Sequence, residues 1–390
     1  MPKITINEID LTQRLSFNPT ENIVYIPCKK IGDNGPIAIK LVETVADLKE
    51  TFLGSVDADL PDTKTTDGKY VYASFIMAAE LLAAGMHVLF QTFADDNFTT
   101  TDGNGSFDHL KDKSLYDFKY FTYGAQGFAG SDTNEIGYAL NLAATRGDCC
   151  ALLCDEHGAF NNIQALGEAL VSTDADNGTY GAFFYPWGIY NVSTVAFDDV
   201  CLPATFGFLY ALAKSSQYAP NWYATAGATR GALPTLVSVE EELGEMSASI
   251  YQPENPSSAA INLICNVRPF GYCIWGNRTM YYKAGAELSA RSFLNIRKLV
   301  CDVKKTLFQA SRQLTFEQNS DLLWANFKAK VSPLLEQMKT GNGLRDYKII
   351  KDVTSKSATL KATVRLFPIE AVEFFDLTVE LADSLSEVTE

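Results

Sequence analysis

A cluster of cysteine and histidine near the middle of the chain has the residue types of a metal site. The stretch CCALLCDEH spans residues 149–157 and contains Cys149, Cys150, Cys154 and His157. Zinc ligands that act as a local pair are typically separated by two to four residues. Adjacent Cys149 and Cys150 would point to opposite faces of a strand, and the chain has no Cys-x-x-Cys pair. We therefore expect no metal here, and we expect the cysteines to be mostly buried free thiols.

Groups that could catalyse a reaction are also poorly placed for it. The three histidines, His87, His109 and His157, are far apart in sequence, whereas acid–base or nucleophilic catalysis needs convergent partners. The motifs GxSxG, GxxxxGK[ST] and HExxH do not occur in the sequence. Asp155 and Glu156 end an apolar run, a common catalytic position in α/β enzymes, but adjacent side chains diverge. We expect no catalytic site and no cofactor; the alternative is an α/β enzyme with a C-terminal oligomerisation domain.

Charge and hydropathy exclude further classes of protein. The formal net charge of −15 at pH 7 argues against a general nucleic-acid binder, which needs an excess of Lys and Arg. The N-terminal residues MPKITINEIDLTQR contain no apolar segment like that of a secretory signal. The longest apolar run, residues 75–90, is shorter than the roughly 20 residues that cross a bilayer, and it contains Glu80 and His87. We expect a soluble protein made in the cytoplasm, with no nucleic-acid contact and no membrane insertion.

One predicted helix, at about residues 287–313, carries a ladder of positive charge. Its apolar residues recur at alternating spacings of three and four, which predicts one buried stripe. Its cations recur every seven residues, about 10 Å per step, with two more beside them: Arg291, Lys298, Lys305 and Arg312, then Arg297 and Lys304. A solvated face in so acidic a protein should mix its charges. We predict that this ladder binds an extended anionic partner; the simpler interpretation is a solvated face.

Both ends of the chain carry strand patterns. Apolar residues are spaced as in a strand near the N-terminus at Ile4, Ile6, Ile9 and Leu11, with one slip in register. Near the C-terminus they alternate with period two at Phe375, Leu377, Val379 and Leu381. Terminal strands pair either within their own chain or with the sheet of a neighbour. The residue pattern alone favours pairing within the chain.

Between the ends, predicted strands and helices alternate as in an α/β protein, and an α+β region follows. Residues 94–130 are rich in Gly, Asp and Thr, which predicts a short surface insertion. The C-terminal region has two strands, two long helices and further strands. The predicted division is an N-terminal arm (1–20), an α/β domain (21–245), a C-terminal α+β domain (246–371) and a C-terminal arm (372–390).

The stretch GYCIWGNRTM, residues 271–280, places a charged residue directly after an apolar strand. Gly276 ends the strand and Arg278 follows it. These residues could form an active-site loop or the end of a strand in a large assembly.

The order of several such segments resembles contractile tail sheath proteins of phages, R-type bacteriocins and related injection systems. The N-terminal match is VETVADLKETFLG with FIMAAELLAAGMHVLFQTF, and the central match is GAFFYPWGIYNV with CLPATFGFLYALAKSS and NWYATAGATRGAL. The most specific matches are INLICNVRPFGYCIWGNRTM, SFLNIRKLVCDVKKTLFQASRQLTFEQNSDLLWANF and RLFPIEAVEFFDLTVEL. The resemblance covers nearly the whole chain.

The resemblance implies a structural subunit that acts without catalysis. Such subunits form a metastable helical sleeve around an inner tube, lend both terminal arms to the sheets of their neighbours, and drive the tube through a target envelope on contraction. It implies that Trp275, Gly276 and Arg278 belong to the core of a tube-facing domain. The partners it implies are further copies of the chain, the inner tail tube protein, and baseplate and tail terminator proteins. The expected location is a virion tail or contractile particle.

Overall fold

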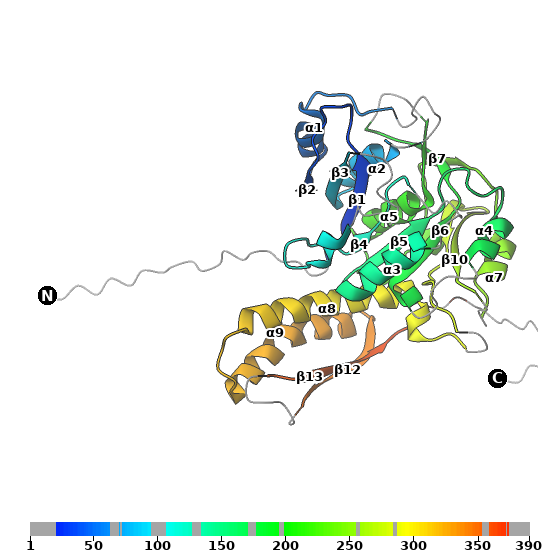
Figure 1. Ribbon diagram of the computed structural model, residues 1–390. Helices are drawn as coiled ribbons and strands as arrows, with labels where there is room; N and C mark the ends of the chain where they lie inside the picture. The colour runs from blue at the N-terminus through cyan, green and yellow to red at the C-terminus, as the bar shows by residue number, and fades with distance from the viewer. Residues whose placement is uncertain are drawn as a thin grey trace, which may run out of the picture.

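An eight-stranded open sheet forms the centre of the molecule (Figure 1). The computed structural model describes residues 21–62, 70, 72–94, 107–126, 134–170, 177–194, 199–254, 258–283, 287–352, 359–371 and 373. The strand order is β11-β10-β6-β5-β4-β1-β3-β2. The bounds are β1 Ile23–Lys29, β2 Ile39–Val42, β3 His87–Phe93, β4 Tyr120–Phe121, β5 Cys150–Cys154, β6 Gly181–Tyr185, β10 Ile261–Val267 and β11 Gly271–Trp275. The six inner strands run parallel, and the edge strands β2 and β11 are antiparallel to their neighbours.

Both faces of this sheet are covered by helices, which is why its strands are almost wholly apolar. On β1, Val24 and Ile26 face one buried cluster, and Ile23 and Tyr25 face the other. The first face is covered by α1 (Val45–Leu53), α2 (Ala73–Ala83) and α5 (Ala204–Ser215). The second face is covered by η1 (Phe107–Lys111), α3 (Asn134–Arg146), α4 (Ile163–Leu170) and α7 (Glu245–Tyr251). The predicted α/β class is confirmed.

A small three-stranded sheet lies beside the carboxyl ends of the central strands. Its strands are β7 (Gly188–Asn191), β8 (Asp199–Leu202) and β9 (Leu236–Val239), in the order β8-β7-β9. Trp187 links the end of β6 to β7, and its indole donates a hydrogen bond to the backbone oxygen of Asp155 just after β5, at 2.9 Å. The short elements η2 (Asn177–Tyr180) and α6 (Gly227–Arg230) complete this part of the chain.

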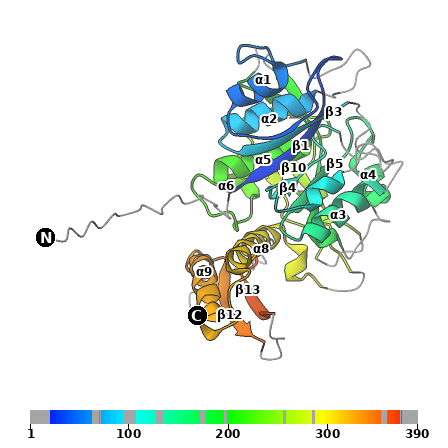
Figure 2. The same cartoon turned by 60° about the vertical axis from the view of Figure 1, so that its left-hand side comes forward.

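The C-terminal elements form a second, smaller layer below the sheet (Figure 2). After η3 (Ala290–Ser292), α8 (Leu294–Leu314) and α9 (Asp321–Thr340) pack against each other. The antiparallel strands β12 (Leu344–Lys351) and β13 (Ala362–Pro368) lie on them. The core of this layer joins both helices to β12 through Leu299, Val303, Phe327, Leu335 and Leu344.

Two predicted divisions of the chain are wrong. A boundary at residues 245/246 would assign β10 and β11 to the C-terminal domain, but β10 pairs with β6 in the central sheet. The smaller layer therefore begins near α8.

The predicted insertion at 94–130 also contains part of the core. Phe107, Phe118 and Phe121 are buried against Tyr25, and Tyr120–Phe121 is an inner strand. The prediction rested on the many Gly, Asp and Thr residues of the segment, whereas its aromatic residues decide its place in the core.

Candidate functional site

The predicted positive ladder begins with Arg291 in η3 and continues on α8, and it contains both buried and accessible cations. Lys298 is 1% exposed, Lys305 4% and Arg297 9%, whereas Arg291 and Arg312 are exposed. The expectation of one exposed basic stripe is therefore wrong for Arg297, Lys298 and Lys305. Their burial has a simple cause: α8 is the helix of the smaller layer that packs against the larger layer. Its apolar face packs on α9, and its charged face contacts loops at the amino ends of β4 and β6.

Lys298 is held by neutral oxygen atoms. Its Nζ donates to the backbone oxygen of Tyr223 and to Thr225 Oγ1, both at 2.9 Å. Burial lowers the pKa of Lys298 to about 7, and the nearby ammonium of Lys119 contributes to the shift. A side chain so enclosed cannot contact another protein without unfolding its surroundings.

Two ion pairs fix the middle of α8 to the strand β4. Lys119, just before β4, pairs with Asp302 at 2.5 Å, and both side chains are fully buried. Lys305 pairs with Asp117. Removal of one partner of a fully buried pair such as Lys119–Asp302 typically costs about 3–5 kcal/mol, because the other charge is left buried. Asp117 is 45% exposed, so the second pair is partly screened by water. These pairs hold the two layers in one orientation.

Two other cations of α8 contact η2, just before β6. Arg297 Nη2 donates to Thr179 Oγ1 at 2.6 Å, and its guanidinium lies 4.3 Å from the ring centre of Tyr180. Lys304 lies over the same ring at 5.3 Å and is only partly buried. Cations over aromatic faces gain electrostatic stabilisation.

Arg278 follows β11 and is held by hydrogen bonds to two distant parts of the chain. Its backbone N–H donates to Asn262 Oδ1 at 2.8 Å, and its Nε donates to Glu373 Oε2 at 2.6 Å. A Cβ atom on Gly276 would lie 2.6 Å from Asn262 Oδ1 and 2.7 Å from the side-chain amide of Gln252, so a larger residue there would displace these side chains. The side chain of Arg278 is 2% exposed. Of the two interpretations of this stretch, a structural strand end fits the geometry.

The strands β12 and β13 form a sheet of two, with no further strand beside either edge within the described residues. A two-stranded sheet is marginal by itself, and free edges favour the addition of another strand. The exposed face of β13 also carries Phe367, with 53% of its surface accessible.

The predicted arm residues lie outside the part of the chain that the structure describes: Ile4, Ile6, Ile9, Leu11, Phe375, Leu377, Val379 and Leu381. Glu373, the only residue of the predicted C-terminal arm that the structure describes, pairs with Arg278.

The cysteines of residues 149–157 do not meet as ligands. Cys149, Cys150 and Cys154 are buried, and burial raises the pKa of each thiol above its usual range. His157 instead lies beside Cys201 and Glu240, two residues that the sequence did not connect with it.

The other candidate groups have separate environments. His87 pairs with Glu21, and His109 lies 3.0 Å from Gln91 Oε1. Burial raises the pKa of Asp155 well above its usual range, with Glu240 adding to the shift. Within the described parts of the chain, no helix combines the length and apolarity needed to cross a membrane.

Comparison with known proteins shows one consistent similarity. No protein-family profile matches the chain. A tail sheath protein of Vibrio phage KVP40 is 22% identical over 172 residues, which is 42% of this chain and 24% of that protein. The chain thus matches only about a quarter of the length of this curated relative.

Solved structures match over nearly the full length. A chain in the contracted baseplate of the anti-feeding prophage superposes with a TM-score of 0.69 at 16% identity, covering 98% of both chains. The contracted sheath complex of the PVC extracellular contractile injection system gives 0.66 at 17%, covering 99% of this chain and 98% of that one. A sheath tail protein from Desulfitobacterium hafniense gives 0.55 at 8%, covering 94% and 100%. The fold is that of contractile sheath proteins, and the resemblance found in the sequence is confirmed.

Proposed function

We propose that this protein is a structural subunit of a contractile sheath. Subunits polymerise as a helical sleeve around an inner tube, and contraction of the sleeve drives the tube through a target envelope. The observation that carries the proposal is the match of the whole chain, at a TM-score of 0.66, to the sheath complex of a contractile injection system.

The terminal arms are proposed to link neighbouring subunits. The β12–β13 sheet has edges that can accept strands, and both ends of the chain have strand-like sequences. Glu373, near the start of the C-terminal arm, pairs with Arg278, and we propose that the residues after it extend toward another subunit. Contacts of this head-to-tail kind generate open helices rather than closed rings.

The surface that faces the tube is proposed to include the accessible cations of the smaller layer. Arg291, Lys304 and Arg312 are the members of the predicted ladder that retain exposure, and Lys328 is exposed on α9. Lys330 on α9 donates to Gln313 on α8 at 2.7 Å, which joins the two helices near Arg312. Weak contacts of this kind, each worth about 0–1 kcal/mol, can hold a sleeve and still break on contraction.

The remaining partners follow from the same proposal. The ends of a sleeve meet a baseplate and a tail terminator, and the subunit is made in the host cytoplasm before it enters a virion tail or contractile particle. The proposed work is mechanical and needs no nucleotide.

The test is the state of assembly of the purified protein. Analytical sedimentation and negative-stain electron microscopy should show long helical sleeves of this protein, whose yield rises with protein concentration. A small closed oligomer at every concentration would favour the alternative of an enzyme with an oligomerisation domain.

A further inference from the structure

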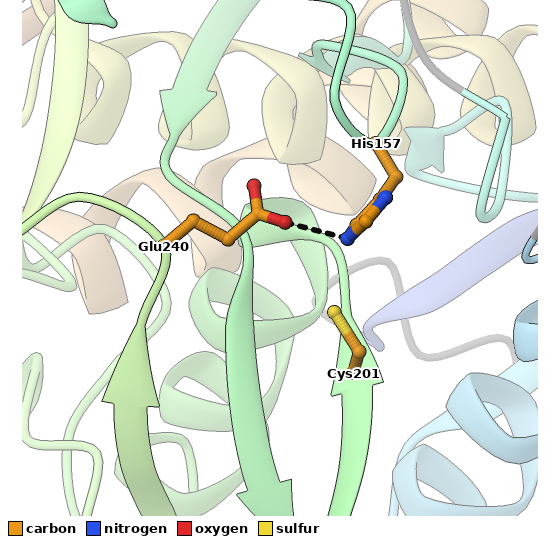
Figure 3. Close-up of side chains that lie close together, drawn as sticks. All are labelled: His157, Cys201 and Glu240. Atoms are coloured by element: carbon orange, nitrogen blue, oxygen red, sulfur yellow. Dashed lines mark ion pairs between the residues drawn. The ribbon is translucent and has the colours of Figure 1, made fainter. Parts of the chain in front are cut away.

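Three potential metal ligands from distant parts of the sequence meet at the carboxyl ends of the central strands. His157 follows β5, Cys201 lies on β8 and Glu240 follows β9 (Figure 3). The imidazole, thiol and carboxylate atoms all lie within 4.8 Å of one another. In open α/β sheets the carboxyl ends of the strands are the usual position of ligand sites.

Trp187 positions all three segments. Its indole donates to the backbone oxygen of Asp155, two residues before His157, at 2.9 Å. Its backbone oxygen accepts from the N–H of Glu240 at 3.0 Å. Its ring meets the imidazole of His157 edge to face, with centroids 5.2 Å apart, and Cys201 pairs with Ile189 just beyond it. The ligand atoms therefore project from backbone that is already fixed.

The imidazole is also held from a second side. The ring of Tyr70 lies 4.3 Å from that of His157, and the hydroxyl of Tyr70 is hydrogen-bonded to Cys201. A histidine enclosed by two aromatic rings loses little freedom when it binds a ligand. The side chains of His157 and Glu240 are 31% and 33% exposed, so an ion can reach them from solvent.

We propose that His157, Cys201 and Glu240 form a binding site for a divalent transition-metal ion of the zinc class. One nitrogen, one sulfur and one carboxylate oxygen are a ligand set that zinc accepts, with water or the Tyr70 hydroxyl in the fourth position. Alkaline-earth ions prefer oxygen ligands, so the thiol selects against magnesium and calcium.

Small side-chain movements bring these atoms to coordination distances. Zn–N and Zn–O distances near 2.0–2.2 Å and a Zn–S distance of about 2.3 Å place tetrahedral ligand atoms roughly 3.3–3.6 Å apart. His157 Nε2 and Glu240 Oε1 are 2.5 Å apart as an ion pair, so they must separate by about 1 Å. The sulfur must approach from a distance of at most 4.8 Å. Rotation about side-chain bonds supplies both changes.

The bound ion would join the three-stranded sheet to the central sheet. His157 belongs to the end of β5, whereas Cys201 and Glu240 belong to β8 and the end of β9. A metal bridge at this point would stabilise the larger layer without touching the β12–β13 edges. The sequence predicted no metal at His157, because its partners lie far along the chain.

The test is metal binding by the full-length chain under a non-thiol reductant. After chelation and dialysis, titration with Zn²⁺ should give one ion per chain, and Co²⁺ should give tetrahedral absorption bands with a thiolate-to-cobalt charge-transfer band. Cys201→Ser should abolish the charge-transfer band. His157→Gln and Glu240→Gln should weaken Zn²⁺ binding at least about 100-fold, and Zn²⁺ should raise the melting temperature of the unmodified chain alone.

Glu156→Gln is the matched control, because it makes the same chemical change beside His157 and should leave binding unaltered. No stoichiometric binding by the unmodified chain would overturn the proposal and leave His157 and Glu240 as an ion pair only. Retention of the charge-transfer band in Cys201→Ser would assign the metal to another cysteine and overturn it equally. Neither result bears on tube formation, so failure here leaves the proposed sheath role untouched.

Discussion

The two layers of the molecule differ in how many faces and edges of their sheets are covered by other parts of the chain. The central sheet is covered by helices on both faces, and its edge strand β11 meets the segment 231–233 through backbone hydrogen bonds from Leu233 N to Tyr272 O and from Ile274 N to Gly231 O. The β12–β13 sheet is covered on one face and has no additional strand within the described residues. Within the described residues the central sheet therefore has one outer edge without a further strand, at β2, whereas the β12–β13 sheet has two.

We propose that this difference gives the two layers separate tasks. The larger layer supplies stability, and the buried cations of α8 fix the smaller layer to it. The smaller layer then presents strand edges in a defined orientation. A sheath subunit of the kind we propose, which would keep its links to neighbours during contraction, would need this combination.

The largest expected effect comes from removing the arms. Deletion of residues 1–15, or of residues 374–390, should leave a folded monomer that forms no sleeves, because the proposed arm hydrogen bonds would be made between chains. The second deletion keeps Glu373, which pairs with the buried Arg278. Sedimentation velocity and thermal melting measure the two properties separately. Normal polymerisation of either truncated chain would remove that arm from the account.

Charge reversal on α8 should separate the buried cations from the accessible ones. Lys298→Glu places a carboxylate in an enclosed site and should lower the free energy of unfolding by about 3–5 kcal/mol. Arg312→Glu is exposed and should change it by less than about 0.5 kcal/mol. Urea unfolding with unchanged m-values checks both. Equal effects would mean that α8 does not pack against the larger layer.

The pKa of Lys298 predicts a third, smaller effect. Its folded-state value of about 7 is below the ordinary 10.5, so between these values the unfolded chain binds more protons. Burial of the charged form of Lys298 lowers the free energy of unfolding by its full amount below pH 7. As the pH rises above 7 the free energy of unfolding recovers, by at most about 1.4 kcal/mol per pH unit.

The test compares the unmodified chain with Lys298→Met by urea unfolding at pH 7 and at about 8.5. The stability difference should shift in favour of the unmodified chain by about 1–2 kcal/mol over this interval. Higher pH is unsuitable, because the buried thiols have raised pKa values and destabilise the fold as the pH rises above their ordinary range. Identical pH profiles for the two chains would rule out a titrating Lys298.

The smallest effect is expected from charge reversal at the proposed contacts with the tube. Arg312→Glu with Lys328→Glu should reduce the yield of extended sheaths on the cognate tube severalfold without altering folding, and high salt should mimic part of it. Lys111→Glu with Lys214→Glu makes the same charge change on exposed residues of the larger layer and serves as the control. Equal yields from both double variants would place the tube elsewhere.

Much of the fold could be predicted from local patterns. The helix expected at about residues 287–313 contains most of α8, Leu294–Leu314, and the second of the two long helices expected in the C-terminal region is α9. The spacing of apolar residues predicts such elements, because a helix or strand depends on residues that are near one another in the chain. The strand end at Arg278 was likewise visible as an apolar run stopped by Gly276.

The environment of the ladder on α8 could not be predicted in this way. Cations seven residues apart share one face of a helix whether that face meets water or another layer. Lys298 and Lys305 are buried because residues near 117 and 223, distant in sequence, cover them. The contact of His157 with Cys201 and Glu240 could not be predicted either, because these residues are also distant in sequence.

The most direct test of the sheath assignment is electron microscopy of the full-length chain expressed with its cognate inner tube protein. The account predicts hollow helical sleeves around tubes, together with shorter, wider sleeves after contraction. Discrete closed particles, with no sleeve at any protein concentration, would contradict it.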